Sequence, residues 1–257
     1  MIGSREWMTR HQGRLSAKEK LKLIQQVLMP VSIAYAQRFL NPKITPIELD
    51  LGQVKLPDTA IVKEAIDALE HCSSIALIDH SWRSLYWAIA IAQHKSWHYD
   101  LESLTIASLM HDLGLNDAQA NAGCHCFTYV SALKAEQLCH QHHYPADKTH
   151  NIADAICLHM NGYLDEDDRN LSTEVILLQQ ATACDVIGTD LSSIPLQFRS
   201  QVLAQHPRAG FNQQFRRYLK DEAKRHPHSR TALLRQLGLP LMMAYSGFVT
   251  APKQRKK

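Results

Sequence analysis

The sequence predicts an all-α fold for its 257 residues. Apolar residues recur at the three- and four-residue intervals that line one face of a helix. Residues that commonly start or stop helices, such as Asp100, Ser172 and Gly188, stand at the ends of these segments. No run of β-branched residues alternates with polar ones as in a strand, and no internal repeat is present. The expected architecture is therefore one fairly large helical domain.

The N-terminal part is expected to be a helical extension. Residues 16–40 predict one or two helices, with Pro30 as a kink or break because proline lacks the amide hydrogen. Residues 41–58 contain three prolines and little helical periodicity, which predicts an extended loop across the surface. The Pro-Asp-Thr sequence at 57–59 is then a start signal for the next helix.

The rest of the chain is expected to form helices separated by polar loops. Asp100 is the expected N-cap of one helix, and the Ser-Thr-Glu sequence at 172–174 combines a cap with an acidic first turn. The loop through Gly123 is polar, and the loop over 161–170 is acidic. The expected helices span about 59–72, 79–94, 100–111, 127–143, 146–159, 172–188, a short segment from 195, 209–225 and 229–237.

The composition excludes several classes of protein. Hydrophobic residues make up 45% and charged residues 21%, which is ordinary for a globular protein. The net charge is only +3, and much of it lies in the tail at 253–257, so no nucleic-acid partner is expected. Residues 1–14 do not resemble a signal peptide, and no apolar run approaches the about 20 residues of a membrane span. The six cysteines favour reduced, partly buried thiols in a cytoplasmic protein without a membrane partner.

The stretch Met110–Gly114 joins a His-Asp pair to the end of an apolar helical segment. Leu104 and His111 fall near one face of this segment, and Gly114 is expected to stop the helix. The pair His111-Asp112 would therefore stand where a buried helix opens toward a cavity. A nitrogen ligand beside a carboxylate, with access for water, suits a metal ion.

Three more groups that can bind a metal stand on apolar helical faces: His80, His159 and Asp185. Asp185 is costly to bury unless it binds a cation, pairs with an arginine or caps a neighbouring helix. His159 could donate to a developing negative charge, line a pocket or be satisfied by a backbone carbonyl. Arg83 lies one turn after His80, so it could pair with Asp112, with Asp185 or with a surface acid.

The order His80, His111-Asp112, Asp185 resembles the HD superfamily of metal-dependent hydrolases. In that family the pattern H…HD…D lies on separate helices of an all-α bundle, so the resemblance implies an HD-domain helical bundle. Further similarity points to the cyanamide hydratase-like branch. The stretches that carry it are Leu56–Thr59, Asp79–Arg83, Met110–Leu115, Ala155–His159, Asp185–Gly188 and Pro207–Phe211.

The resemblance covers roughly residues 51–234, most of the chain. It implies an HD domain over 51–240. The first fifty residues (1–50) would be an N-terminal helical extension, and 241–257 a C-terminal tail.

The resemblance also implies a chemistry. One divalent metal ion is expected, zinc first, with iron or manganese as alternatives. The ion would lower the pKa of a bound water, which then attacks an electrophile. In the cyanamide hydratase-like branch that electrophile is the carbon of a small C≡N group. The expected metal ligands are His80, His111, Asp112 and Asp185. The expected catalytic residues are Asp112, His159, Arg83 and Thr128.

One position departs from the pattern of that branch. Where its members often carry Phe-Glu at the start of a helix, this chain has Phe127-Thr128. A threonine can hydrogen-bond, but it cannot take a proton at neutral pH. The chemistry of the branch could therefore be retained in part, altered or lost.

Other interpretations stay open. One is an HD phosphohydrolase acting on a nucleotide or other phosphoester, although no phosphate-binding loop is present. Another is a degenerate HD domain that binds a ligand without turnover. A two-metal site would need further histidines, and those available are His125, His140, His142, His143 and His159. A separate zinc site at 124–126 would lack its partner pair.

The expected partner is a small-molecule substrate, and the apolar stretch 239–243 could join copies into a homo-oligomer.

Overall fold

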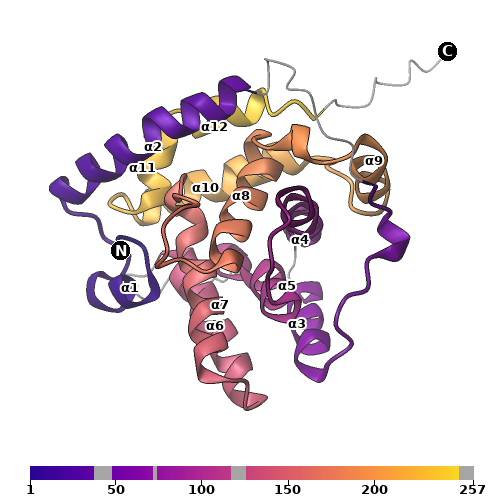
Figure 1. The fold of residues 1–257 in the computed structure, drawn as a ribbon. Helices are drawn as coiled ribbons and strands as arrows, with labels where there is room; N and C mark the ends of the chain where they lie inside the picture. Colours follow the sequence, from indigo (N-terminus) through magenta and orange to yellow (C-terminus); the bar gives the residue numbers. More distant parts are fainter. Residues whose placement is uncertain (38–47, 72–73, 117–125, 249–257) are drawn as a thin grey trace.

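The computed structural model describes residues 1–37, 48–71, 74–116 and 126–248. Within these ranges the chain forms twelve α-helices and no strand, so the all-α prediction is confirmed (Figure 1). No helix in these ranges has the length and apolar character that a membrane span requires. The helices are α1 (Arg5–His11), α2 (Ala17–Gln37), α3 (Ala60–Glu70), α4 (Ile75–Lys95), α5 (Leu101–Met110), α6 (Phe127–Gln141), α7 (Ala146–Leu158), α8 (Thr173–Ile187), α9 (Leu196–Gln205), α10 (Phe211–Arg225), α11 (Arg230–Gln236) and α12 (Leu239–Ala244). Short 3₁₀ turns include η1 (Leu51–Gln53), η2 (Leu113–Asn116), η4 (His159–Asn161) and η5 (Leu191–Ser193).

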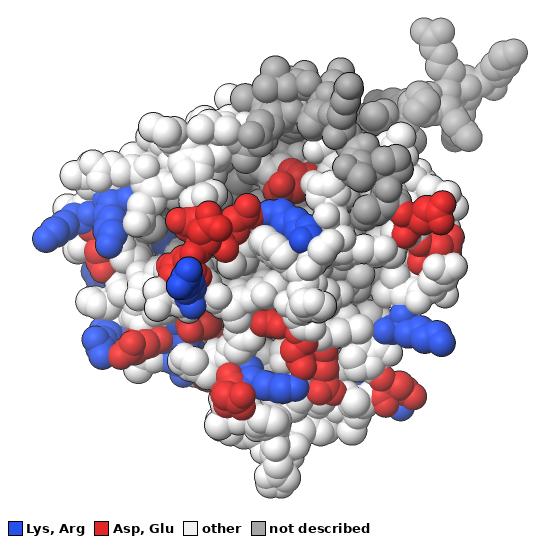
Figure 2. Space-filling model, in the orientation of Figure 1, with Lys and Arg blue, Asp and Glu red and all other residues white. Residues whose placement is uncertain are grey.

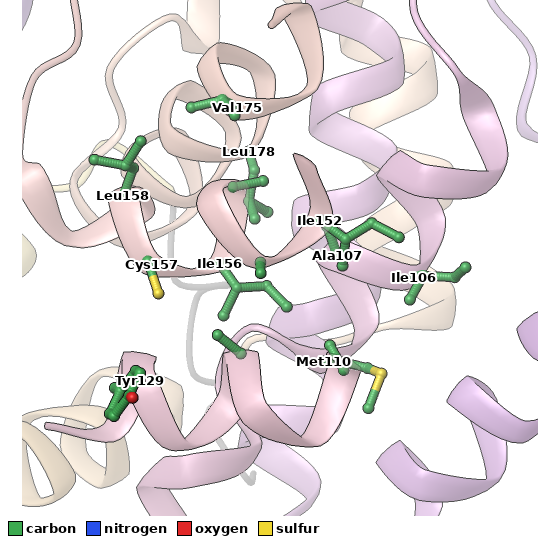
Figure 3. Packing of buried hydrophobic residues seen from close by; sticks show 14 of the residues in the cluster. Ile106, Ala107, Met110, Tyr129, Ile152, Ile156, Cys157, Leu158, Val175 and Leu178 are labelled. Carbon is green, nitrogen blue, oxygen red and sulfur yellow. The ribbon is translucent and has the colours of Figure 1, made fainter. Parts of the chain in front are cut away.

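Helix α7 lies at the centre of the main hydrophobic core, between α5, α6 and α8. Figure 3 shows Ile152 and Ile156 of α7 among side chains of the neighbouring helices. Ala107 on α5 and Leu178 on α8 are fully buried against them. This packing holds the C-terminal ends of α5 and α7 in fixed positions, and both ends carry residues of the candidate site.

The helix ends follow the start and stop signals in the sequence. The Asp100 side chain accepts a hydrogen bond from the Ser103 amide at the start of α5, and Ser172 caps α8 in the same way. Gly188 ends α8 with a φ of 79°, in the left-handed region that glycine adopts without strain. These three predictions are confirmed.

Some predicted boundaries are wrong. Helices α1 and α12 were not expected, because each spans only about two turns and shows no clear period. Helix α4 begins at Ile75, four residues before the expected start at 79. Helix α2 is a single helix with Pro30 inside it, which is one of the two arrangements expected for this segment.

Gly114 was expected to stop a helix, and this expectation is wrong. Helix α5 has already ended at Met110, and Gly114 lies in η2. A Cβ at this position would lie 2.2 Å from the carbonyl oxygen of Phe127. The glycine therefore permits a close approach between the end of α5 and the start of α6.

The N-terminal segment packs onto the central helices. Met8 of α1 is fully buried in the main core. The guanidinium of Arg5 donates two hydrogen bonds of 2.8 Å to the carboxylate of Glu136 on α6. Figure 1 shows α2 crossing the molecule near α11 and α12.

Charged side chains are mixed on the face shown in Figure 2. Lys and Arg lie interspersed with Asp and Glu, and uncharged surface separates them. Among the described residues, this face therefore presents no extended basic region of the kind that binds nucleic acid.

Candidate metal centre

The candidate site forms where the ends of several helices meet. His80 lies in the second turn of α4, and His111 is the C-cap of α5 with Asp112 directly after it. His159 is the C-cap of α7 and begins η4. Asp185 lies in the last turn of α8. All five side chains are buried, so the sequence-predicted residues come together inside the protein.

Three of these residues bring one atom each to a common point. The Nε2 atoms of His80 and His111 are 3.3 Å apart. The Oδ2 atom of Asp112 lies 3.6 Å from Nε2 of His80 and 3.5 Å from Nε2 of His111. His80, His111 and Asp112 therefore form a group that could hold a metal ion.

The histidines of the site are oriented by contacts on the far side of their rings. Nδ1 of His80 lies 2.7 Å from Oδ2 of Asp185. Nδ1 of His111 lies 2.7 Å from the Ser108 carbonyl oxygen, and Nδ1 of His159 lies 2.7 Å from that of Ile156. Because carbonyl and carboxylate oxygens only accept, each Nδ1 carries the hydrogen and donates it. In the neutral form of such a ring, Nε2 keeps a lone pair, the state in which imidazole binds a metal.

Burial keeps two of these rings neutral. It lowers the pKa of His111, and the neighbouring His80 lowers it further, although the charge of Asp112 acts in the opposite direction. The pKa of His159 falls well below its ordinary value, first through burial and then through the neighbouring His111. Neutral rings of this kind present lone pairs rather than protons to a cation.

The carboxylate of Asp112 provides the test of whether a metal fits. Only 2% of the side chain is exposed, and neither of its oxygens has a hydrogen-bond partner among the described residues. A buried carboxylate without a partner is costly, because it has lost its water and gained nothing. A cation between Asp112 and the Nε2 atoms would satisfy it, so the residues present fit a divalent ion.

Asp185 lies behind His80. Its Oδ1 accepts hydrogen bonds from Nε of Arg83 at 2.8 Å and from Nε1 of Trp87 at 3.0 Å. Nη2 of Arg83 reaches Oδ2 at 2.9 Å, and Nη1 of Arg208 lies 2.9 Å from Oδ1. In this arrangement Asp185 supports His80, and its predicted role as a metal ligand stays a prediction.

The charges around Asp185 keep it ionised. Burial would raise its pKa, but Arg83 and Arg208 and the hydrogen bonds from His80 and Arg83 bring the pKa well below its ordinary value. The carboxylate therefore acts as a permanent acceptor for the Nδ1 hydrogen of His80.

The sequence is similar to that of two yeast hydratases. Cyanamide hydratase DDI2 and cyanamide hydratase DDI3 of Saccharomyces cerevisiae are each 26% identical to this chain over 165 residues. The matched region covers 62% of this chain and 70% of each cyanamide hydratase. No protein-family model matches the chain. The similarity is distant, and the names of both relatives denote enzymes.

Two residues beside the site, Arg208 and Phe211, have no site role predicted from the sequence. Arg208 reaches Asp185 from the loop before α10, and the ring of Phe211 stacks on His80 with centroids 4.9 Å apart. Both residues lie in the stretch Pro207–Phe211, which carried part of the resemblance to the cyanamide hydratase-like branch. That resemblance was the only signal for them, because neither residue belongs to a local motif that implies metal chemistry.

Thr128 lies outside the group formed by His80, His111 and Asp112. Its Oγ1 accepts a hydrogen bond of 2.9 Å from Nη2 of Arg230. Arg230 is buried, and its Nη1 also donates to the Cys157 carbonyl oxygen at 2.7 Å. Thr128 is thus placed as a partner of a buried guanidinium, and its predicted catalytic role stays a prediction.

The other histidines considered for a second metal lie elsewhere. His140 and His143 are exposed, and Nε2 of His142 lies 2.6 Å from Oε2 of Glu64 at the surface. His125 and Cys124 fall outside the described residues, as does Cys72. The four other cysteines are free and buried, as expected: Cys126, Cys139, Cys157 and Cys184.

A pocket of about 120 Å³ adjoins the candidate metal centre. His80 and His159 form part of its wall. The remaining wall comes mainly from α2, α8 and the segments from α10 to α12. A molecule bound at the candidate centre could therefore extend into this pocket.

Proposed function

We propose that this protein is a metal-dependent hydratase of the HD superfamily that adds water to the carbon of a small C≡N compound. The observation that carries the proposal is the buried carboxylate of Asp112, which has no hydrogen-bond partner in the described part of the chain and whose Oδ2 faces the Nε2 atoms of His80 and His111. The similarity to yeast cyanamide hydratases supports the choice of reaction.

The ion would be held by His80, His111 and Asp112, with Asp185 holding the ring of His80 in place. Zinc is expected, and iron or manganese are alternatives. When bound, the ion supplies a Lewis acid that lowers the pKa of water toward neutrality.

The chain's own residues would then position the reactants and move the protons. Oδ2 of Asp112 lies among the ligand atoms, which leaves Oδ1 to accept a hydrogen bond from the attacking water. Nε2 of His159 lies 3.6 Å from that Oδ1 and is unprotonated. It can accept a proton as the water oxygen bonds to carbon, and return it to the nitrogen that receives the electron pair of the C≡N bond. The immediate product of this addition is an imidic acid, C(OH)=NH, and transfer of its hydroxyl proton to the nitrogen gives the amide.

Phosphoester hydrolysis is the competing reaction. Transfer of a phosphate group usually needs arginine or lysine side chains free to bind its oxygens. Arg83 and Arg208 both lie near the centre, but Asp185 engages both guanidinium groups. The chain's residues thus favour an uncharged electrophile.

The metal content of the purified protein tests the proposal first. We expect about one divalent ion per chain by elemental analysis, and its loss in His111→Ala. His142→Ala is the matched control, because that histidine pairs with Glu64 at the surface and is not part of the buried group. If the protein holds no stoichiometric metal and His111→Ala leaves the content unchanged, the protein is a binding domain without metal catalysis.

A substrate panel then separates the two reactions. Cyanamide and simple nitriles are assayed for amide formation, beside p-nitrophenyl phosphodiesters assayed for nitrophenol release. We expect amide formation that disappears in His111→Ala. Turnover of phosphodiesters without any hydration of C≡N compounds would refute the hydratase and support the phosphohydrolase.

A further inference from the structure

The pocket beside the metal centre is apolar along most of its wall. Its lining includes Val31 of α2, Val186 of α8, Phe215 of α10 and Met242 of α12. Among the described residues that line it there is no Asp, Glu, Lys or Arg. A polar or charged molecule would find little here to replace its lost water contacts.

Two of the three polar side chains in the lining besides the histidines donate hydrogen bonds within the protein, and the third, Ser32, lies on the exposed side of α2. The side-chain nitrogen of Gln179 donates to the Gly162 carbonyl oxygen at 3.2 Å. The hydroxyl of Thr182 donates to the Gln179 carbonyl oxygen at 3.0 Å. The pocket therefore offers its occupant mainly van der Waals contact, away from the end formed by the two histidines.

The pocket is also larger than the proposed reacting group needs. Its volume is about 120 Å³, whereas one water needs only about 10–15 Å³ on the same measure. Cyanamide has three non-hydrogen atoms, so it would leave most of this space without a partner. An apolar substituent on the substrate would fill it.

We infer that the substrate carries an apolar substituent next to its C≡N group, and that the pocket between α2, α8 and α12 binds this substituent. The inference rests on the proposed function, since the C≡N group is assigned there. A straight chain of about four to six carbons matches the space beyond the reacting group. Leu28 lines the pocket and is 46% exposed, so the far end of the pocket lies close to the surface at α2.

Apolar contact of this kind predicts a definite dependence on chain length. Each methylene moved from water into the pocket should tighten binding about threefold to fourfold. The gain should continue while the chain fills the pocket and stop when the space is used.

The test measures binding separately from turnover. N-alkylureas are the products expected from N-alkylcyanamides, and they are not hydrated further. Their dissociation constants for the zinc-loaded protein are measured by titration calorimetry, from methylurea to hexylurea. We expect the dissociation constant to fall about threefold to fourfold per carbon, up to about four to six carbons.

A pair of variants locates the binding site. Met242→Trp fills the pocket and should remove the dependence on chain length while leaving the metal content unchanged. Leu241→Trp is the matched control, because this neighbour on α12 is 65% exposed and does not line the pocket. Circular dichroism and metal analysis confirm that both variants are folded and loaded.

The outcomes separate this inference from the proposed function. A dissociation constant independent of chain length in the wild-type protein overturns the inference, even if cyanamide is hydrated. Chain-length dependence that Met242→Trp abolishes supports it, even if no C≡N compound is turned over. If Leu241→Trp removed the dependence on chain length as fully as Met242→Trp, the alkyl chain would bind elsewhere, and the inference would also be overturned.

Discussion

Nδ1 of His80 and Oδ2 of Asp185 lie 2.7 Å apart in the interior, where neither side chain is more than 1% exposed. The contact links the end of α8 to the second turn of α4 and turns the opposite nitrogen of His80 toward Asp112. Arg83 and Arg208 hold the aspartate from its other sides. A carboxylate placed in this way fixes the tautomer of the histidine and raises its basicity as a ligand.

Replacing Asp185 with asparagine should weaken metal binding by about 10–100-fold. The asparagine keeps the shape of the side chain but loses the charge that holds the Nδ1 hydrogen of His80. Competition with a chromophoric zinc chelator measures the affinity, and Asp67→Asn on the exposed face of α3 is the control. If Asp185→Asn abolished metal binding as completely as His111→Ala, Asp185 would instead be a direct ligand, as the resemblance to the HD family implied.

Asp112→Asn should abolish metal binding and yet stabilise the metal-free protein. The wild-type carboxylate is buried without a hydrogen-bond partner among the described residues, and a neutral amide is less costly to bury there. We expect the free energy of unfolding in the presence of a chelator to rise by about 1–3 kcal/mol. Urea unfolding with and without zinc measures both effects. Lower stability of the metal-free variant would show that Asp112 has a partner that stabilises its charge.

The fold was predictable where the sequence carries local signals. Asp100 and Ser172 cap their helices through side-chain hydrogen bonds to nearby amides, so a few neighbouring residues specify each start. Helix α1 could not be found in this way. Trp7 and Met8 are buried by contact with distant helices, and seven residues are too few to show a period.

The histidines of the candidate site were predictable from the sequence, whereas their partners were not. His80, His111 and His159 stand among apolar residues, and a polar side chain in such a position needs a partner. The partners themselves are set by tertiary contacts. Arg208 meets Asp185 only because the loop before α10 passes over the end of α8, and no spacing in the sequence shows this.

Gly114→Ala should destabilise the protein without replacing any of the proposed metal ligands. The added Cβ would lie 2.2 Å from the Phe127 carbonyl oxygen, so the turn after Asp112 and the start of α6 must move apart. Overpacking of this kind costs about 1–3 kcal/mol. Chemical unfolding measures the change. Gly52→Ala is the control, since its Cβ would meet only the side chain of Asp50, at 3.1 Å. Equal effects of the two changes would contradict the prediction.

Thr128→Ala should lower stability and leave metal content unchanged. The hydroxyl oxygen of Thr128 accepts a hydrogen bond from Arg230, which is only 2% exposed. In the described part of the chain, no ion pair joins Arg230 to an acidic side chain. Loss of this acceptor leaves part of a buried guanidinium unsatisfied, at a cost of about 1–3 kcal/mol. Urea unfolding and elemental analysis measure the two quantities.

Thr128→Ser separates a structural role from a catalytic one, because it keeps the hydroxyl that Arg230 needs. We expect serine to restore the free energy of unfolding, and we expect kcat for C≡N hydration to differ little among the three proteins once each is folded and loaded with metal. Unchanged stability in Thr128→Ala together with a large fall in kcat would instead place the hydroxyl in contact with the substrate. In that case Arg230, held 2.9 Å from the same oxygen, would position Thr128 for the reaction.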